Sequence, residues 1–392
     1  MKKIAFLLLF SSFSFGQSLL KTINLLPDTG QNLSYTNTFG EDQDYTINPP
    51  SYTNNANGTI TDNVTQLMWQ QGDGGEMTIE NAIIYAQNLV LGGFSDWRLP
   101  IPIEGFSILN HQNNNPAMNT TFFTSSVAGY WWTSSFQAGD ASKVWCTNAG
   151  GGIGNHPKSE TISAGGSKKF HARCVRDTSP PTTFTNHFTD NGNGTITDNL
   201  TQLIWQKAPN TTAQTWEAAL GYAENLNLAN IFDWRLPNIK ELQSLNDENL
   251  TNPSANTTYF ATIGVKNYWS ATSLPNQILK AWYWNTQFGI TTYDTKTNSN
   301  YVICVSGNPT VLGLKTINNS AKIKVFPNPF STTIAIENVG QDQNFELYNS
   351  FGQSLFYGKN IQKQDFSGLP KGVYFLIIIN NETNLSVKLV KQ

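Results

Sequence analysis

The sequence predicts an α+β protein in which two tandem copies of one unit are followed by a small all-β sandwich. A stretch of fourteen residues from Asn57 returns from Asn193 with twelve identical positions, and the pentapeptide Asp-Trp-Arg-Leu-Pro at 96–100 returns unchanged at 233–237. The spacing of about 136 residues is that of a tandem domain rather than of a solenoid repeat. From residue 322 onward, short alternating strand patterns separated by Gly and Asn predict the sandwich.

These patterns divide the chain into segments. Lys2 and Lys3, followed by the apolar run 4–10, are typical of a signal peptide, and the run is too short to span a bilayer. The pair Pro180-Pro181 indicates a short extended linker between the two copies. The predicted segments are a signal peptide at 1–16, an N-terminal extension at 17–50, repeat 1 at 51–177, a linker at 178–187, repeat 2 at 188–307, a second linker at 308–321 and a C-terminal domain at 322–392.

Each repeat is expected to open with a hairpin, continue with two helices and end in strands. Asn57-Gly58 predicts a tight turn feeding a strand that ends at Trp69, and Thr78 is a suitable N-cap for an amphipathic helix. The Pro that closes the pentapeptide suits the start of a second helix, expected at 239–245 in repeat 2 and weakened in repeat 1 by Pro102. Further strands are expected at 130–135, 143–148 and 171–176 in repeat 1, at 268–273, 280–285 and 301–306 in repeat 2, and at 323–326, 333–336, 345–348, 354–357, 373–379 and 386–390 in the C-terminal domain.

Composition restricts the classes of partner. Only 13% of the residues are charged, against about 25% in ordinary soluble proteins, and the net charge is -3. Such a weak charge favours neither a nucleic-acid partner nor an anionic membrane surface. The three cysteines leave two interpretations open. Either Cys146 and Cys174 of repeat 1 form a disulfide, or all three, with Cys304, are small buried hydrophobic residues.

The segments at 61–62, 67–69, 96–100, 130–135, 144–145 and 173–176 form a set that resembles a bacterial family once catalogued as DUF1566 and also named after the C-terminal domain of a collagen-like adhesin. The resemblance covers both repeats and implies a C-type-lectin-like fold, an order of elements that the hairpin, helices and strands match. The opening Leu-Pro-Asp-Thr-Gly-Gln at 26–31 is also similar to the start of such proteins. Repeat 2 departs at 303–306, where both arginines of repeat 1, Arg173 and Arg176, are missing.

The last seventy or so residues resemble the type A sorting domain of the type IX secretion system. The residues that carry this resemblance are Phe326-Pro-Asn-Pro-Phe330, Leu347-Tyr-Asn349, Gly352, Leu369-Pro-Lys-Gly-Val-Tyr374 and the terminal Lys388-Leu-Val-Lys391. The resemblance implies a small Ig-like sandwich and recognition by the type IX secretion machinery. It also implies export to the cell surface, with release or attachment there.

Aromatic residues are the main candidates for binding. Tryptophans that recur in both copies are expected in the core, and Trp69, Trp97, Trp131 and Trp145 are paired with Trp205, Trp234, Trp269 and Trp282. Tyr283-Trp284 replaces Cys146-Thr147 in repeat 2, so this pair is a candidate ligand site. Because neighbouring strand residues face opposite sides, Trp284 is expected to share the core face with Trp282, which leaves Tyr283 as the better exposed candidate.

Charged candidates are few. The locally basic stretch with His156, Lys168, Lys169 and His171 is either a site for an anionic glycan or a solvated loop. The Asp and Arg of each pentapeptide are expected to form a structural ion pair or turn hydrogen bonds. The stretch 190–198 resembles a calcium loop, but Thr201 stands where its closing acid belongs, so a hairpin turn is favoured. We expect neither a metal nor a cofactor.

These observations predict a secreted or surface-attached protein without a transmembrane segment. The first hypothesis is an adhesin-like protein that recognises a glycan or a matrix surface, by analogy with the fold. The second is a structural component of the cell surface that interacts with other proteins. The third is an enzyme that uses Cys146 or Cys174, as in the related fold of sulfatase-activating proteins; the surrounding motif is missing, and four histidines leave little acid–base chemistry, so we expect no enzyme.

Overall fold

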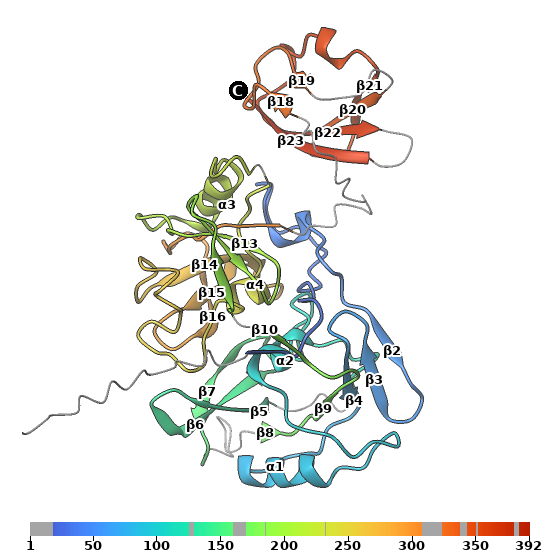
Figure 1. Ribbon diagram of the computed structural model, residues 1–392, viewed down its shortest axis with the longest axis vertical. Coiled ribbons are helices and arrows are strands. Elements are labelled where there is room, and N and C mark those ends of the chain that lie inside the picture. The colour runs from blue at the N-terminus through green and yellow to red at the C-terminus, as the bar shows by residue number, and fades with distance from the viewer. Residues whose placement is uncertain are drawn as a thin grey trace, which may run out of the picture.

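The computed structural model describes residues 19–124, 129–159, 170–184, 186–231, 233–307, 324–337, 343–349, 352–379 and 384–392. Within them the protein is mostly β-structure with a few short helices (Figure 1), which is consistent with the predicted α+β tandem units. The two repeats lie against each other, and the C-terminal domain stands beyond repeat 2 (Figure 1). The predicted signal peptide and the predicted linker at 308–321 lie outside the described residues.

Repeat 1 contains two helices and two sheets, whose strands are antiparallel except for the parallel pair β5–β8. The first sheet has the order β2-β3-β4-β9, with strands β2 (Tyr52–Asn54), β3 (Thr59–Asp62), β4 (Leu67–Gln70) and β9 (Val175–Asp177). The second has the order β7-β6-β5-β8, with strands β5 (Tyr130–Gln137), β6 (Asp140–Asn148), β7 (Ile153–Pro157) and β8 (Phe170–His171). The helices are α1 (Ile79–Asn88) and α2 (Pro102–Ser107).

Repeat 2 has the same plan. Its first sheet has the order β11-β12-β13-β17, with strands β11 (Phe188–Asp190), β12 (Thr195–Asp198), β13 (Ile204–Gln206) and β17 (Val305–Ser306). Its second has the order β14-β15-β16, with strands β14 (Asn267–Ser273), β15 (Lys280–Asn285) and β16 (Ile290–Thr295). The helices are α3 (Trp216–Glu224) and α4 (Ile239–Gln243).

Local sequence explains the starts of these helices. The Thr78 side chain accepts a hydrogen bond from the backbone N–H of Asn81, which caps α1. The carboxylates of Glu104 and Glu241 accept from the backbone N–H groups of Ile101 and Asn238, three residues earlier, and so close the first turns of α2 and α4. The second helix therefore forms in both repeats, although Pro102 was expected to weaken it in repeat 1.

The strand predictions at 171–176 and 301–306 were wrong in part. In repeat 1 this stretch leaves one sheet and joins the other, because Phe170 and His171 pair with β5 whereas β9 pairs with β4. In repeat 2 only Val305 and Ser306 form a strand. Strands β7 and β16 were not predicted, since neither shows an alternation of apolar and polar residues.

The segment predicted as an N-terminal extension packs against both repeats from residue 19 onward. Strand β1 (Leu19–Lys21) pairs with β10 (Thr182–Phe184) of the predicted linker, and residues 23–47 run between the two repeats (Figure 1) and include the short helix η1 (Asp42–Asp44). The buried Lys240 ammonium donates to the carbonyl oxygens of Asp28 and Ser107 at 2.8 and 2.7 Å. The segment therefore links α4 of repeat 2 to α2 of repeat 1.

The two repeats also share an apolar core. Trp282 of β15 is buried in the same cluster as Phe106, Trp145 and Ile153 of repeat 1, and the His111 ring lies edge-to-face on it at 5.6 Å. Gly151 leaves space for the Trp282 ring, because a Cβ added at this position would lie 3.3 Å from the ring. Each repeat nevertheless keeps further core clusters of its own.

The C-terminal domain is a small all-β unit around one core. Its sheets have the orders β21-β20-β22-β23 and β18-β19, with strands β18 (Lys324–Phe326), β19 (Ala335–Glu337), β20 (Asn344–Asn349), β21 (Ser354–Gly358), β22 (Gly372–Ile379) and β23 (Asn384–Lys391), and a short helix η2 (Ile361–Lys363). Buried residues from both sheets, such as Ile336 and Leu376, form the core. The Lys388 ammonium pairs with the Glu224 carboxylate of repeat 2.

Candidate functional site

The recurring tryptophans are core residues, as predicted. All eight named in the sequence analysis are buried. One pairing was wrong: Trp269 corresponds to Trp132, because both indole N–H groups donate to a backbone carbonyl just before the first helix, at Met77 and Gln214. Trp131 corresponds to Tyr268. These rings stabilise the fold and are not available as surface platforms for a ligand.

The residues singled out for binding do not form one site. Trp284 is fully buried in the core of repeat 2, so it is removed from the candidates. Tyr283 lies on the opposite face, as expected from strand alternation, but is half-buried with its ring edge-to-face to Trp269 at 6.2 Å. His156 belongs to repeat 1, where it packs at 4.7 Å from Tyr130. Lys168 and Lys169 lie outside the described residues.

The cysteines are buried, and no disulfide joins Cys146 to Cys174. Burial raises the pKa of the Cys174 thiol to about 12 and also raises the pKa of Cys304 well above its usual value. These thiols are therefore held protonated. The interpretation as small hydrophobic residues fits their positions.

The suspected calcium loop is a hairpin turn between β11 and β12. The Asp190 carboxylate accepts from the backbone N–H of Gly192 at 3.0 Å and pairs with the Lys207 ammonium at 2.5 Å. Within the described residues no group of three or more His, Cys, Asp or Glu side chains is placed to hold a metal ion.

A buried polar cluster is specific to repeat 1. The Asp73 carboxylate lies 3.0 Å from Nδ1 of His171 and 4.0 Å from the Arg173 guanidinium. Burial opposes the charge of Asp73, but the hydrogen bond and the positive charges around it outweigh burial and lower its pKa. Arg173 also donates to the carbonyl oxygens of Gln71 and Thr124, at 2.6 and 3.0 Å, so the cluster holds a loop in place.

The Asp and Arg of the pentapeptide were predicted to form a structural ion pair or turn hydrogen bonds, and in repeat 1 each pairs with a residue outside the pentapeptide rather than with the other. The Arg98 guanidinium binds both oxygens of Glu104, at 2.6 and 2.8 Å, and Asp177 at 3.0 Å. Asp96 pairs with Arg176 at 2.7 Å. In repeat 2, Arg235 binds both oxygens of Glu241 at 2.6 Å. The arginine thus ties the pentapeptide to the first turn of the second helix, and its role is structural.

One open groove adjoins this arginine in repeat 1. It has a volume of about 360 Å³, at the lower end of the range for ligand pockets of roughly 300–1,000 Å³. We call it the repeat 1 groove; it is lined by Ile83, Ala86 and Gln87 of α1, by Trp97, Arg98, Leu99 and Ile101, and by Thr22, Ser134, Asp177 and Pro181. Thr22 and Pro181 flank the β1–β10 pair, which borders the groove and leaves it open.

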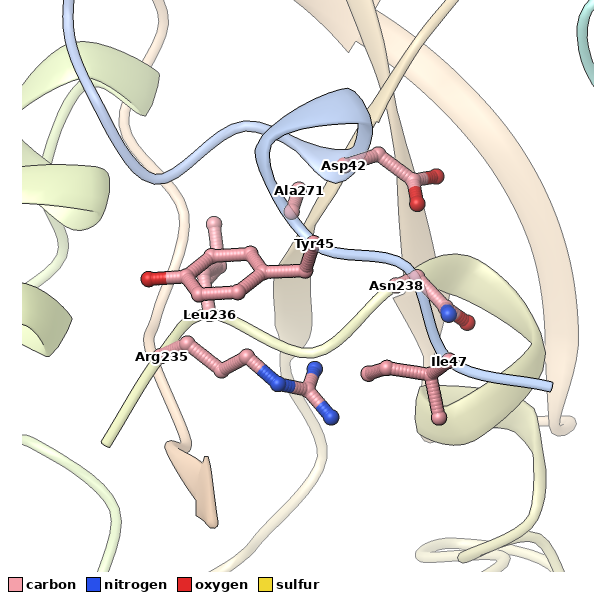
Figure 2. Close-up of a pocket in the computed structure, with 7 residues that line it drawn as sticks. All are labelled: Asp42, Tyr45, Ile47, Arg235, Leu236, Asn238 and Ala271. Atoms are coloured by element: carbon pink, nitrogen blue, oxygen red, sulfur yellow. The ribbon is translucent and has the colours of Figure 1, made fainter. Parts of the chain in front are cut away.

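The equivalent place in repeat 2 is filled by the chain itself. Arg235, Leu236, Asn238 and Ala271 occupy the positions of Arg98, Leu99, Ile101 and Ser134, and Figure 2 shows Tyr45 of the N-terminal segment lying beside Arg235, with Asp42 and Ile47 nearby. The Arg235 guanidinium lies 5.6 Å from the Tyr45 ring centroid, and the Tyr45 hydroxyl donates to Glu224. The space that remains has no room for a water molecule.

Comparison with known families decides the identity of the repeats. The Lcl C-terminal domain model matches residues 58–176 and again 194–306, which together are more than half of the chain. The protein belongs to the Lcl C-terminal domain family. The two matched stretches are the two structural repeats, so this is a tandem Lcl C-terminal protein. No curated protein matches the chain.

The end of the chain matches the secretion system C-terminal sorting domain over residues 324–392. This Lcl C-terminal protein is therefore cargo of the type IX secretion machinery and reaches the outer surface of the cell. None of the helices in the described part of the chain is long and apolar enough to cross a membrane.

Sequence reasoning missed the repeat 1 groove, although one signal was present. The sequence holds two repeats but a single segment with Glu41-Asp-Gln-Asp-Tyr45, and nothing similar precedes repeat 2 at 178–187. A segment that covers one of two equivalent surfaces leaves the other uncovered. The presence of one covering segment for two repeats, rather than any residue within the repeats, indicates where the groove lies.

Proposed function

We propose that this protein is an adhesin-like binding protein of the outer cell surface, which recognises a glycan or a matrix polymer through repeat 1. The repeat 1 groove supports the proposal, because the equivalent surface of repeat 2 is filled by Tyr45 whereas this one is open. It combines apolar walls from Ile83 and Leu99 with polar groups from Gln87 and Arg98, the composition typical of binding pockets. Export to the surface places the groove where such a partner is found.

The proposal includes a C-type-lectin-like fold for each repeat. The order of a hairpin, two helices and a second sheet supports it. In both repeats the last strand returns to pair with the hairpin, β9 on β4 and β17 on β13, so the ends of each unit lie together. The groove, and not the fold, supports the proposed function, since a fold by itself is compatible with many activities.

We do not propose a catalytic role. The buried thiols of Cys174 and Cys304 are held protonated by their raised pKa values, which opposes nucleophilic chemistry. The Asp73–His171 pair is enclosed, and its neighbours include Arg173 and the Trp131 indole. A double variant, Cys146→Ser with Cys174→Ser, is expected to keep full binding.

The second candidate is a structural component of the cell surface that packs on neighbouring proteins. The exposed apolar residues Ile278 and Leu279 at the β14–β15 turn favour it, because such residues are typical of contact surfaces. On this alternative the groove has no ligand, and substitutions at the turn, rather than in the groove, weaken attachment to the surface.

The test is binding of the mature chain to a glycan array and to a panel of matrix polymers, with three proteins compared. Gln87→Trp places a large ring at the groove from an exposed position of α1, and Asn81→Trp adds the same ring at another exposed position of the same helix. We expect binding that Gln87→Trp abolishes and Asn81→Trp preserves. Failure of the native chain to bind any glycan or polymer, or equal binding by all three proteins, contradicts the proposal.

A further inference from the structure

We propose that the repeat 1 groove binds a tyrosine side chain presented by an extended segment of a partner polypeptide. The inference rests on the proposed function and names the class of partner. Its basis is the duplication itself. Repeat 2 shows what this surface holds when it is occupied, and in repeat 1 none of the described residues occupies the same surface.

Repeat 2 supplies the template. Tyr45 fills the site through three interactions: its ring lies by Arg235, its hydroxyl donates to Glu224 of α3, and Phe39 packs edge-to-face on it at 5.7 Å. Three residues before it, Asp42 accepts a hydrogen bond from the Thr272 hydroxyl at 2.5 Å. The occupant is thus a tyrosine preceded at a distance of three by an acid.

Repeat 1 keeps the groups that receive this side chain. Arg98 corresponds to Arg235, and its side chain is 32% exposed where that of Arg235 is 2% exposed. A guanidinium held flat by a bidentate carboxylate can present its face to an aromatic ring, which is attracted to the cation. Ser134 is exposed, whereas Ala271 at the equivalent place is buried beneath the N-terminal segment.

The differences between the repeats are compatible with the same occupant. Gln87 replaces Glu224, and its amide oxygen accepts a hydrogen bond from a phenolic hydroxyl as a carboxylate does. Ser135 replaces Thr272, so a hydroxyl donor for the acid is retained. Asp177 replaces Gly307 and binds Arg98 at 3.0 Å. The negative charge that Asp177 adds is paired with the arginine.

A sugar ring fits these observations less well. Sugar recognition uses an exposed aromatic face, and the single aromatic residue that lines the groove, Trp97, is only 4% exposed. The apolar wall from Ile83, Ala86 and Leu99 matches a hydrophobic ring that carries one hydroxyl. We therefore assign the groove to a polypeptide and treat a glycan ligand as an outcome of the test.

The experiment measures fluorescence anisotropy of labelled peptides with the mature chain. The probe has the sequence of residues 36–48, the natural occupant of the repeat 2 site, and its partner probe carries Tyr45→Ala. We expect saturable binding of the tyrosine probe, at least about tenfold weaker binding of the alanine probe, and at least about tenfold weaker binding by Gln87→Trp but not by Asn81→Trp. Ser134→Trp, on a different element, is a second blocking variant.

The outcomes separate this inference from the proposed function. Three results overturn the inference: the tyrosine probe does not bind up to about 1 mM, both probes bind equally, or both blocking variants bind the tyrosine probe as well as the native chain does. A glycan that binds and is blocked by Gln87→Trp, without peptide binding, overturns it while leaving the proposed function standing. Self-association of the chain that the tyrosine probe competes away supports it, with a second copy as the partner.

Discussion

The two repeats share one plan, but the surface beside the pentapeptide arginine is covered in repeat 2 and open in repeat 1. Both carry an arginine bound bidentately by a glutamate three residues into the following helix, at Arg98–Glu104 and Arg235–Glu241. In repeat 2 this pair is sealed by Tyr45, whereas in repeat 1 it borders an open groove of about 360 Å³. A duplication therefore produced one closed surface and one open surface, because a single N-terminal segment serves both copies.

The same segment holds the repeats together. Gln31 exchanges two hydrogen bonds with the backbone of Ser273, at 2.9 and 3.0 Å, and the backbone N–H of His111 donates to the Thr29 carbonyl. The repeats are thus not independent domains joined by a flexible linker. Their relative position is fixed by a third element, and repeat 1 is left with an exposed groove.

The largest expected difference between the repeats concerns the two glutamates. Glu241→Gln leaves the Arg235 guanidinium buried without its counter-charge, and we expect a loss of about 3–5 kcal/mol in the free energy of unfolding. Glu104→Gln is expected to cost about 1–2 kcal/mol, because Arg98 is partly exposed and keeps Asp177. Urea unfolding of the two variants measures both values. Equal losses would show that the groove is closed in solution.

Tyr45→Ala is expected to turn repeat 2 into a second open repeat. Loss of a half-buried ring and its hydroxyl contact with Glu224 should cost about 2–3 kcal/mol. The same variant should take up two equivalents of the tyrosine probe where the native chain takes up one, as measured by titration calorimetry. Tyr45→Phe, which loses only the hydroxyl, is the matched control and should keep one. If both variants bind only one molecule of the tyrosine probe per chain, the two sites are not equivalent.

A pH effect is expected at the interface between the repeats. Burial, and next the positive charge of Lys240, lower the pKa of His111 from 6.5 to about 3, while Nε2 stays bound to the Gly151 carbonyl at 2.8 Å. Below pH 6.5 the unfolded chain takes up a proton that the folded chain refuses, so stability falls as the pH falls. By pH 5 the loss is about 2 kcal/mol.

Unfolding titrations between pH 5 and 7.5 measure this slope. His111→Gln keeps a polar side chain without a titrating group and should flatten the curve. The equivalent place in repeat 2 holds Glu248, so the histidine contribution belongs to repeat 1 alone. An unchanged slope in the variant would assign the effect to other groups.

The smallest effect is expected where repeat 1 is given the residue of repeat 2. Arg176 lies over the Phe94 ring at 3.9 Å and pairs with the exposed Asp96, whereas in repeat 2 the Ser306 hydroxyl donates to Asp233 at 2.7 Å. Arg176→Ser should lower the free energy of unfolding by less than about 1 kcal/mol, since exposed ion pairs contribute little. A larger loss, measured by urea unfolding, would mean that this arginine supports the edge of the groove.

Several elements could be predicted from the sequence because their signals are local. The Asn57-Gly58 turn, the Thr78 cap and the alternation of Trp282, Tyr283 and Trp284 depend on neighbouring residues, and the structure confirms them. The strands β7 and β16 were not predictable in this way. Their residues pair because a neighbouring strand is present, and their own side chains show no period of two.

The ion pairs illustrate the same limit at the level of single residues. Asp96 and Arg98 are two positions apart, yet each binds a residue that is distant in sequence or on the next helix, Arg176 and Glu104. Side chains two apart on an extended segment point the same way but have separate neighbours. The charge pattern was visible in the sequence, but the partners were set by packing.

The sequence by itself determined that the chain carries two copies of one Lcl C-terminal unit and a sorting domain for export, because these depend on motifs and on their repetition. It also predicted the burial of the tryptophans that recur in both copies, since recurring residues meet the same packing demands. The tertiary structure alone decided that one N-terminal segment joins the copies, closes repeat 2 with Tyr45 and leaves the groove beside Arg98 open. Contacts between residues about two hundred positions apart form only when the folded repeats pack against each other, and no local sequence pattern predicts that packing.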